Sequence, residues 1–298
     1  MAAARPIMTQ AVESPPGMPG WVTVARTETL EGMAFLSGAA LATLHGVLAS
    51  SDLPQALLRE RLALAAAEAC VALSGRPERT ADLRDAIHLL RPGDGPGPAG
   101  EILQHWRQAV ARPISGATLR RALPQMSVER ISVWLDAGRG GCPVGQAAGV
   151  LEAVLTEAPS TETAALILAD AALARALGWT PLVPLLSVHL KSRDLRQTGE
   201  ALRLACHRAV IAAATDTVRL AADLTRRAAR LRAVLPKLRA KGAGEAVTLF
   251  LSRDALAPSL ALAGILSDRA ARRLCERLVE LGVVRELTGR DSFRLYGV

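Results

Sequence analysis

The sequence predicts a mainly α-helical protein that ends in a small β-hairpin. Half of its 298 residues are hydrophobic but only 3% are aromatic, so the core must consist of Leu, Val and Ala, which suits closely packed helices. Apolar residues recur at helical spacing along most of the chain, as they do in amphipathic helices. Only after Gly282 does the pattern change to a strand-like one.

Composition divides the chain into four segments. Residues 1–30 are rich in Pro, Gly, Ser and Thr, and we expect them to be disordered. A multi-helix N-terminal domain follows over 31–192, then basic linker helices over 193–242 and a C-terminal domain over 243–298. A chain of this length is sufficient for two or three domains, or for one large domain.

Glycine and proline mark the ends of helices in the N-terminal domain. Gly75 and Pro77 end the second helix, the stretch 91–100 ends the third, and Gly178 closes the last. The spacing predicts helices over about 32–49, 52–73, 81–90 and 102–110, one or two within 117–137, and further helices over 144–157 and 160–177.

Arginine and lysine recur through the helical stretch 195–241, which Pro236 bends or ends. The formal net charge of the chain is +8, which favours an anionic partner, either nucleic acid or an acidic membrane surface. The basic stretch can follow a phosphate backbone, or it can be the solvent-exposed side of arginine-rich helices. The sequence leaves both open.

The C-terminal segment contains a strongly amphipathic helix over 268–281. We expect Ser267 to cap its start through the side-chain hydroxyl, and Gly282 to close it in the left-handed conformation. Another amphipathic helix is predicted over 245–253, and Pro258 can open a short helix between the two.

A two-stranded hairpin is predicted after this helix, with strands at 283–287 and 292–296 joined by a turn at 288–291. Helix, helix, turn, helix and hairpin are the order of elements in a winged helix-turn-helix. In that arrangement the last helix lies in the major groove of DNA and the hairpin touches the backbone. The full prediction is therefore a mainly α protein with a C-terminal winged helix-turn-helix.

Charged residues on the outer side of the last helix form the candidate DNA-reading face. Arginine can bind guanine through two hydrogen bonds, and glutamate can accept one from cytosine. Arginines of the hairpin would bind phosphates, which position a protein without reading sequence. The alternatives are a solvated ion-pair face, with Arg272 and Glu276 at i and i+4, or a winged helix that binds a protein. The predicted nucleic-acid-binding residues are Arg269, Arg272, Arg273, Glu276, Arg277, Arg290 and Arg294.

The sequence lacks the motifs of common catalytic and cofactor sites. It contains no nucleophile elbow, dinucleotide fingerprint or kinase motif set. Its cysteines are far apart and have no metal-ligand spacing, which argues against a zinc site or a disulfide framework and fits a reducing cytoplasm. We therefore predict no enzyme, no cofactor and no metal. The four cysteines are Cys70, Cys142, Cys206 and Cys275.

The glycine-rich stretch 138–145 precedes a helix but lacks the Lys–Ser/Thr pair of a Walker loop, so a hinge is predicted. Cys142 lies near that helix start, where a thiolate can be stabilised. Because no histidine is close in sequence to act as its base, we do not predict a catalytic thiol. An enzyme site in the helical domain would need His88 or His105 beside carboxylates. The carboxylates considered are Glu60, Glu68, Asp82 and Asp85.

The N-terminal segment 1–20 lacks the apolar core of a signal peptide. The most apolar run, 33–49, is short for a membrane span and contains His45. We expect a buried helix there, and a cytoplasmic protein with no membrane partner.

Several stretches that together span nearly the whole chain carry a family resemblance: AFLSGAALATL (34–44), LRERLALAAAEACVALSGR (58–76), LRDAIHLLRPGDGPGPAGEIL (83–103), LILADAALARALGW (166–179), PKLRAKGA (236–243) and SDRAARRLCERLVELGVVRELTGRDSFRLYG (267–297). They resemble an uncharacterised bacterial family, the domain of unknown function numbered 1403. A second uncharacterised family, with the same helical front and winged-helix ending, is similar more loosely. The hairpin also resembles winged helices appended to some Fic-domain proteins, whose catalytic motif is absent here. The resemblance implies a helical protein, often carried on plasmids or mobile elements, and it implies no activity.

The function expected from these features is binding of double-stranded DNA, in transcriptional regulation or in plasmid or mobile-element maintenance. A protein partner or a homodimer is left open. One alternative is a non-enzymatic assembly subunit, similar in architecture to kleisin-type subunits, whose winged helix docks on a protein. The other is an enzyme with a site in the helical domain.

Overall fold

The structure is a computed structural model that describes residues 17–24, 27–91 and 93–298. It confirms a mainly helical chain with a small two-stranded hairpin near the C-terminus. Of the segment 1–30 that was predicted to be disordered, residues 1–16 lie outside the described residues. Residues 20–24 of that segment form the short helix α1 (Gly20–Val24), whose Val22 is buried.

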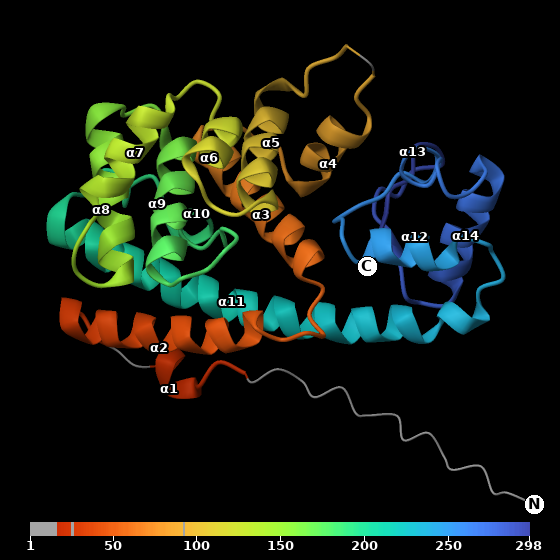
Figure 1. Cartoon of the computed structure of the whole chain (residues 1–298), viewed down its shortest axis with the longest axis horizontal. Helices are drawn as coiled ribbons and strands as arrows, with labels where there is room; N and C mark the ends of the chain where they lie inside the picture. The colour runs from red at the N-terminus through yellow and green to blue at the C-terminus, as the bar shows by residue number, and fades with distance from the viewer. Residues whose placement is uncertain (1–16, 25–26, 92) are drawn as a thin grey trace, which may run out of the picture.

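The helical body comprises α2 to α10 and most of α11, and its helices are joined by short loops (Figure 1). The bounds of its elements are α2 (Leu30–Leu48), α3 (Gln55–Leu73), α4 (Thr80–His88), α5 (Gly97–Ala111), α6 (Gly116–Ala122), α7 (Val128–Ala137), α8 (Pro143–Glu157), α9 (Glu162–Ala176), α10 (Leu186–His189) and α11 (Gly199–Ala233).

Helix α11 connects the two parts of the molecule. Figure 1 shows it running from the helical body to the C-terminal unit, which we define as residues 243–298, with α2 below it and α3 to α10 above. It packs along α2, and also contacts α8 and α10. Alanines supply much of its buried side, which lets neighbouring helices approach closely. The stretch predicted as linker helices is therefore one continuous helix, followed by a 3₁₀ turn, η1 (Leu235–Lys237), at Pro236.

The C-terminal unit contains α12 (Ala243–Phe250), α13 (Pro258–Ala261), α14 (Asp268–Glu280), β1 (Arg285–Glu286) and β2 (Tyr296–Gly297). The strands are antiparallel, with Arg285 opposite Gly297 and Glu286 opposite Tyr296. Leu256, between α12 and α13, adds an antiparallel bridge to Tyr296, and the two residues exchange backbone hydrogen bonds of 2.8 and 2.9 Å.

The hairpin is shorter than predicted. Residues 292–295 are not in a strand, although the N–H of Leu287 donates to the carbonyl oxygen of Leu295 at 2.8 Å. The reason lies at Phe293, which has a φ of 54°, a left-handed conformation that interrupts an extended strand. Regular pairing therefore begins only at Tyr296.

The ends of α14 agree with the prediction in position but not in every contact. Gly282 has a φ of 67°, as expected for a left-handed helix end. Ser267 occupies the capping position, but its side chain makes no capping hydrogen bond, so the predicted hydroxyl cap is wrong. Burial of the apolar side of α14 must supply the stability that such a cap would have added.

Within the described residues, α2 alone is long and apolar enough to cross a membrane by length and composition, and 39% of that window is buried inside the structure. Core helices of soluble proteins share this length and composition. Helix α2 packs along α11, with Leu36, Ala40 and Leu44 buried.

Candidate nucleic-acid interface

Helix α14 has one buried side and one exposed side. Ala271, Leu274, Cys275 and Leu278 are buried in the C-terminal unit. Because these positions recur at helical spacing, the remaining positions are directed to solvent. The five predicted DNA-reading residues on this helix are all exposed: Arg269, Arg272, Arg273, Glu276 and Arg277.

Two arginines of this exposed side are held by acidic neighbours. Arg272 binds Asp268 at 2.9 Å, one turn earlier, and Arg277 binds Glu280 at 2.9 Å. The pair considered between Arg272 and Glu276 is therefore not the one that forms. Within the part of the chain that the structure describes, Arg269 and Arg273 form no ion pair. Their guanidinium groups can bind an anionic partner without first leaving an intramolecular one.

The basic stretch after α11 ends beside the start of α14. A Cβ atom at Gly242 would lie 2.6 Å from Cγ2 of Ile265, so the backbone there closely approaches the turn before α14. Gly242 has a φ of 96°, which favours glycine. Arg239 and Lys241, which immediately precede it, are exposed. The basic residues that precede Gly242 therefore lie near the turn that leads into α14.

The turn of the hairpin is stabilised by its own carboxylate. Glu286 accepts hydrogen bonds from the backbone N–H groups of Thr288 and Gly289, each at 2.7 Å. Burial would raise the pKa of Glu286, but hydrogen bonds from the hydroxyl of Thr288 and from these two N–H groups outweigh it and lower the pKa below its usual value. Arg294 is exposed, and its Nε donates to the backbone oxygen of Arg290 at 2.8 Å.

Arg290 does not extend from the hairpin toward solvent. Its Nη2 and Nη1 bind the two carboxylate oxygens of Asp85 at 2.6 and 3.0 Å. Asp85 belongs to α4 of the helical body. The prediction that Arg290 binds phosphates is thus not met in this conformation, because its guanidinium already has a bidentate partner.

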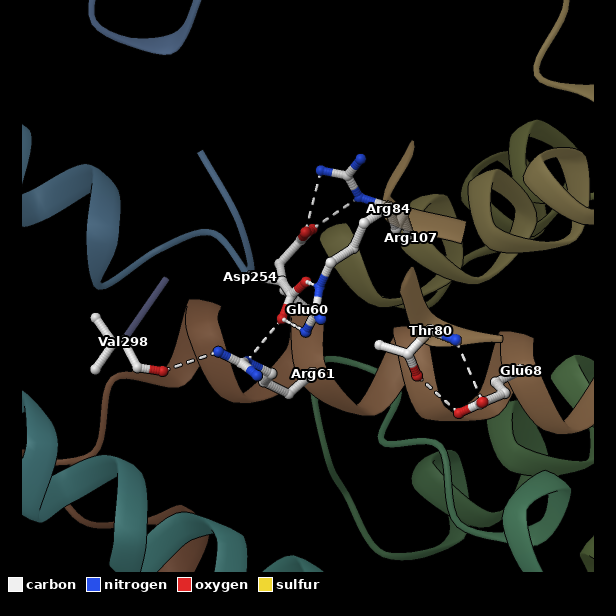
Figure 2. A network of polar contacts seen from close by, with 8 residues as sticks. All are labelled: Glu60, Arg61, Glu68, Thr80, Arg84, Arg107, Asp254 and Val298. Carbon is white, nitrogen blue, oxygen red and sulfur yellow. Dashed lines mark hydrogen bonds and ion pairs between the residues drawn. The ribbon is translucent and has the colours of Figure 1, made fainter. Parts of the chain in front are cut away.

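A second contact joins the C-terminal unit to the helical body through Asp254, which is 7% exposed. Its carboxylate binds Arg61 of α3 at 2.7 Å and Arg84 of α4 at 2.6 Å (Figure 2). Arg61 also donates to the backbone oxygen of Val298 at 2.9 Å. Burial lowers the pKa of Arg61, and the carboxylate of Asp254 opposes that effect. These residues fix the C-terminal unit on α3 and α4.

The comparison of the chain with protein families supports the resemblance seen in its sequence. A family model described as "Protein of unknown function (DUF1403)" matches residues 7–298. The chain belongs to this family. The comparison with curated proteins found no match to the chain. Family membership therefore supplies no site residues for the DUF1403 chain, and its sites must be argued from its own contacts.

The carboxylates considered for an enzyme site have other partners in this DUF1403 protein. Figure 2 shows Glu60 beside Arg107, which it binds at 3.0 Å, and Glu68 beside the hydroxyl of Thr80, which donates to it at 2.7 Å. Asp85 binds Arg290. Asp82 accepts from the backbone N–H of Arg79 at 2.8 Å. The structure does not bring these carboxylates together around His88.

Sequence reasoning missed Arg61, Arg84 and Asp254, the residues that position the interface. Arg84 and Asp254 are 170 positions apart in the DUF1403 chain, and each has an oppositely charged residue beside it in the sequence. No local spacing connects them. Because Arg253 directly precedes Asp254, no sequence signal marked Asp254 as the member of a buried pair.

Proposed function

We propose that this protein binds double-stranded DNA through the exposed side of α14. The observation that supports the proposal best is that Arg269 and Arg273 are exposed and have no ion-pair partner in the described residues, while the opposite side of the helix is anchored. Arg239 and Lys241 extend the positive charge toward the same helix start. Unpaired arginines on a rigid helix suit both phosphate and guanine recognition.

The order of elements in the C-terminal unit also supports this function. Helix α12, the bridged strand residue Leu256, α13, α14 and the β1–β2 hairpin follow one another as in a winged helix-turn-helix. On that model α14 would lie in the major groove, and Arg294 of the hairpin would bind a phosphate. Arg290 would instead hold the hairpin against α4. Regulation of transcription, or maintenance of a plasmid or mobile element in the cytoplasm, is the role proposed for this binding.

Duplex binding by the full chain tests the proposal. The affinity for a pool of duplexes of mixed sequence is measured at two salt concentrations, because log K falls by about 0.9 per neutralised phosphate for each tenfold rise in salt. Arg269→Ala and Arg273→Ala should each weaken binding to a selected site by about 1–3 kcal/mol. Arg120→Ala is the matched control, since Arg120 is an exposed arginine on α6 with no ion pair in the described residues. No binding at low salt, or equal losses in all three variants, would refute the proposal.

A protein partner is the second candidate, and one observation favours it. A groove of about 810 Å³ lies between the end of α4 and the C-terminal unit, and Leu260 and Phe293 line it while being 69% and 76% exposed. Large exposed apolar side chains beside a groove are typical of protein-binding surfaces. Replacing Phe293 and Leu260 with Ser should leave DNA affinity unchanged if the groove serves a protein. Loss of DNA affinity in that variant would assign the groove to DNA instead.

A further inference from the structure

The structure brings together three side chains of the helical body that are far apart in the sequence. Cys142 caps the start of α8, and its Sγ lies 3.9 Å from Nε2 of His207 on α11. Nδ1 of the same imidazole lies 2.7 Å from the hydroxyl of Ser37 on α2. The histidine that the sequence did not place near Cys142 is thus supplied from 65 positions away.

The hydrogen bonds of Ser37 determine which nitrogen of His207 carries the proton. Ser37 donates its one hydroxyl proton to the backbone oxygen of Ala34 at 3.0 Å. With that donation in place, its oxygen accepts from Nδ1 of His207, and this assignment of the tautomer leaves Nε2 unprotonated. The lone pair of Nε2 then faces the thiol of Cys142. A thiol, a base and a third group that orients the base form the arrangement of an activated nucleophile.

The surroundings of His207 keep the imidazole neutral. The residue is 1% exposed, and burial lowers its pKa to about 4. At neutral pH the ring is therefore uncharged, which leaves the lone pair of Nε2 free. Its low pKa makes it a weak base, so it accepts the thiol proton only as the bond from Sγ to the carbonyl carbon forms. The other three cysteines are buried, and burial raises the pKa of Cys70, Cys206 and Cys275 to about 12. Cys142 is the exposed thiol of the described chain.

A cavity of about 370 Å³ adjoins Cys142, and its lining is mostly apolar. Ser37, Leu41 and His45 of α2 line it together with Val144 and Leu177. Nδ1 of His45 accepts a hydrogen bond from Trp179 at 2.9 Å, so the ring proton of His45 is on Nε2 and can be donated to a ligand. In the first turn of α8, Pro143 has no N–H and the N–H of Gly145 donates to Sγ of Cys142 at 3.4 Å. The N–H of Val144 is left as a further donor, because a helix gives it no intrahelical acceptor.

We propose that Cys142, His207 and Ser37 form a nucleophilic site that accepts a small aliphatic acyl group from an ester or thioester. The Sγ of Cys142 attacks the carbonyl carbon, and the thiol proton moves to Nε2 of His207. The bond from the carbonyl carbon to the leaving oxygen or sulfur breaks, and the leaving group takes that proton. An acyl thioester on Cys142 and a free alcohol or thiol result. In the second half of the reaction, water attacks the carbonyl carbon of this thioester and gives a proton to Nε2 of His207. The bond from the carbonyl carbon to Sγ breaks, the carboxylic acid leaves, and Nε2 returns the proton to Sγ.

Each group has a distinct role in this reaction. Cys142 is the nucleophile and His207 is the base and then the acid, while Ser37 is a positioning residue that fixes the ring. Nε2–H of His45 and the backbone N–H of Val144 stabilise the oxyanion as charge develops on the carbonyl oxygen. The apolar cavity holds the acyl chain. This site does not depend on the DNA-binding proposal, since none of its residues lies in the C-terminal unit.

The experiment exposes the full chain to p-nitrophenyl acetate and p-nitrophenyl butyrate. We expect release of p-nitrophenol with one acyl group added per chain, located on Cys142 by peptide mass mapping and absent in Cys142→Ala. The rate should saturate with ester concentration, because the cavity binds the acyl chain before the reaction. His207→Asn should slow acylation about 10²-fold or more, the usual contribution of a positioned base. Ser37→Ala should slow it about tenfold when assayed well below the thermal midpoint of the variant, which falls because Nδ1–H of His207 loses its buried acceptor.

A cavity-filling variant keeps the test decisive if His207→Asn does not fold. Gly38 lines the cavity on α2, and a Cβ there meets nothing within 4 Å, so Gly38→Leu should fold and block the acyl chain. Gly46→Leu is its matched control, since Gly46 is on the same helix, also has open space, and does not line the cavity. We expect Gly38→Leu to lose saturable acylation and Gly46→Leu to retain it. Equal acylation rates in the wild type, Ser37→Ala and Gly38→Leu would overturn the proposal, because Cys142 would then react only as an exposed thiol.

Discussion

Arg290 of the hairpin turn and Asp85 of α4 are joined by two hydrogen bonds, although they are 205 positions apart in the chain. The contact links a loop that would otherwise extend into solvent to a helix of the body. Its side chains are 38% and 32% exposed, so water screens the pair and its contribution to stability is small. Its main effect is therefore on the position and the charge of the hairpin.

Asp85→Asn should release Arg290 for binding to phosphate. We expect the slope of log K against log salt for duplex binding to steepen by about 0.9, which corresponds to one more neutralised phosphate. Asp82→Asn removes the same charge from α4 without affecting Arg290, and it should leave the slope unchanged. Titrations of both variants at several salt concentrations check this, and identical slopes would show that Arg290 does not reach the DNA even when free.

Asp254→Ala should be strongly destabilising, because it leaves Arg61 and Arg84 without their shared carboxylate. Removing one partner of a buried ion pair costs about 3 kcal/mol or more. Asp268→Ala is the control, since it removes the exposed partner of Arg272 and should cost about 0.5 kcal/mol or less. Chemical unfolding of the three proteins measures the difference. Similar losses in both variants would mean that the Asp254 pairs are no stronger than a surface pair.

Gly297→Ala should also weaken the attachment of the C-terminal unit. A Cβ atom at this position would lie 2.6 Å from the backbone oxygen of Asp254, so the hairpin or the loop must move. We expect a loss of about 1–3 kcal/mol, typical of overpacking. Gly264→Ala, where a Cβ meets nothing within 4 Å, should be nearly neutral. Thermal unfolding distinguishes the two, and a neutral Gly297→Ala would contradict the close approach.

Asp170 should make stability depend on pH. It is fully buried in α9, and burial raises its pKa to about 8 despite hydrogen bonds from the backbone N–H groups of Leu185 and Leu186. The folded chain then keeps a proton that the unfolded chain releases near pH 4. Retention of this proton stabilises the folded chain. Its contribution to the free energy of unfolding is fully present below about pH 4 and is lost as the pH rises toward 8, with a slope of at most about 1.4 kcal/mol per pH unit.

Asp170→Asn tests this dependence, because its side chain stays neutral at every pH. Unfolding free energies of the wild type and the variant are compared at pH 5 and pH 8. The wild type should lose more stability than the variant between the two values. Parallel changes in both proteins would show that Asp170 is charged in the folded state.

Periodic features of this chain were predictable from sequence, and contacts between distant segments were not. Helix α14 was found because its apolar positions repeat with the helical period and Gly282 marks its end. The early end of the second strand was not foreseen, because phenylalanine rarely adopts the left-handed conformation that Phe293 has.

Among the charged and nucleophilic residues, too, exposure on a helix could be predicted from the sequence and contacts between distant segments could not. The exposure of Arg269 and Arg273 follows from their place on an amphipathic helix, so the sequence was sufficient to predict it. The approach of His207 to Cys142 depends on how α11 packs against α2 and α8. The spacing of residues in the sequence does not predict that packing, so it could not predict that His207 lies beside Cys142.

Because α11 is one unbroken helix of 35 residues, it is roughly 50 Å long at 1.5 Å per residue. His207 lies near its beginning, and its last turns lead through η1 to α12. A change in the direction of this helix would reach the C-terminal unit only as far as the contacts of Asp254 and Arg290 with α3 and α4 allow. A tilt of only about 5° at the end near Cys142 would carry the far end through roughly 4 Å, which is enough to change which groove positions the arginines of α14 reach.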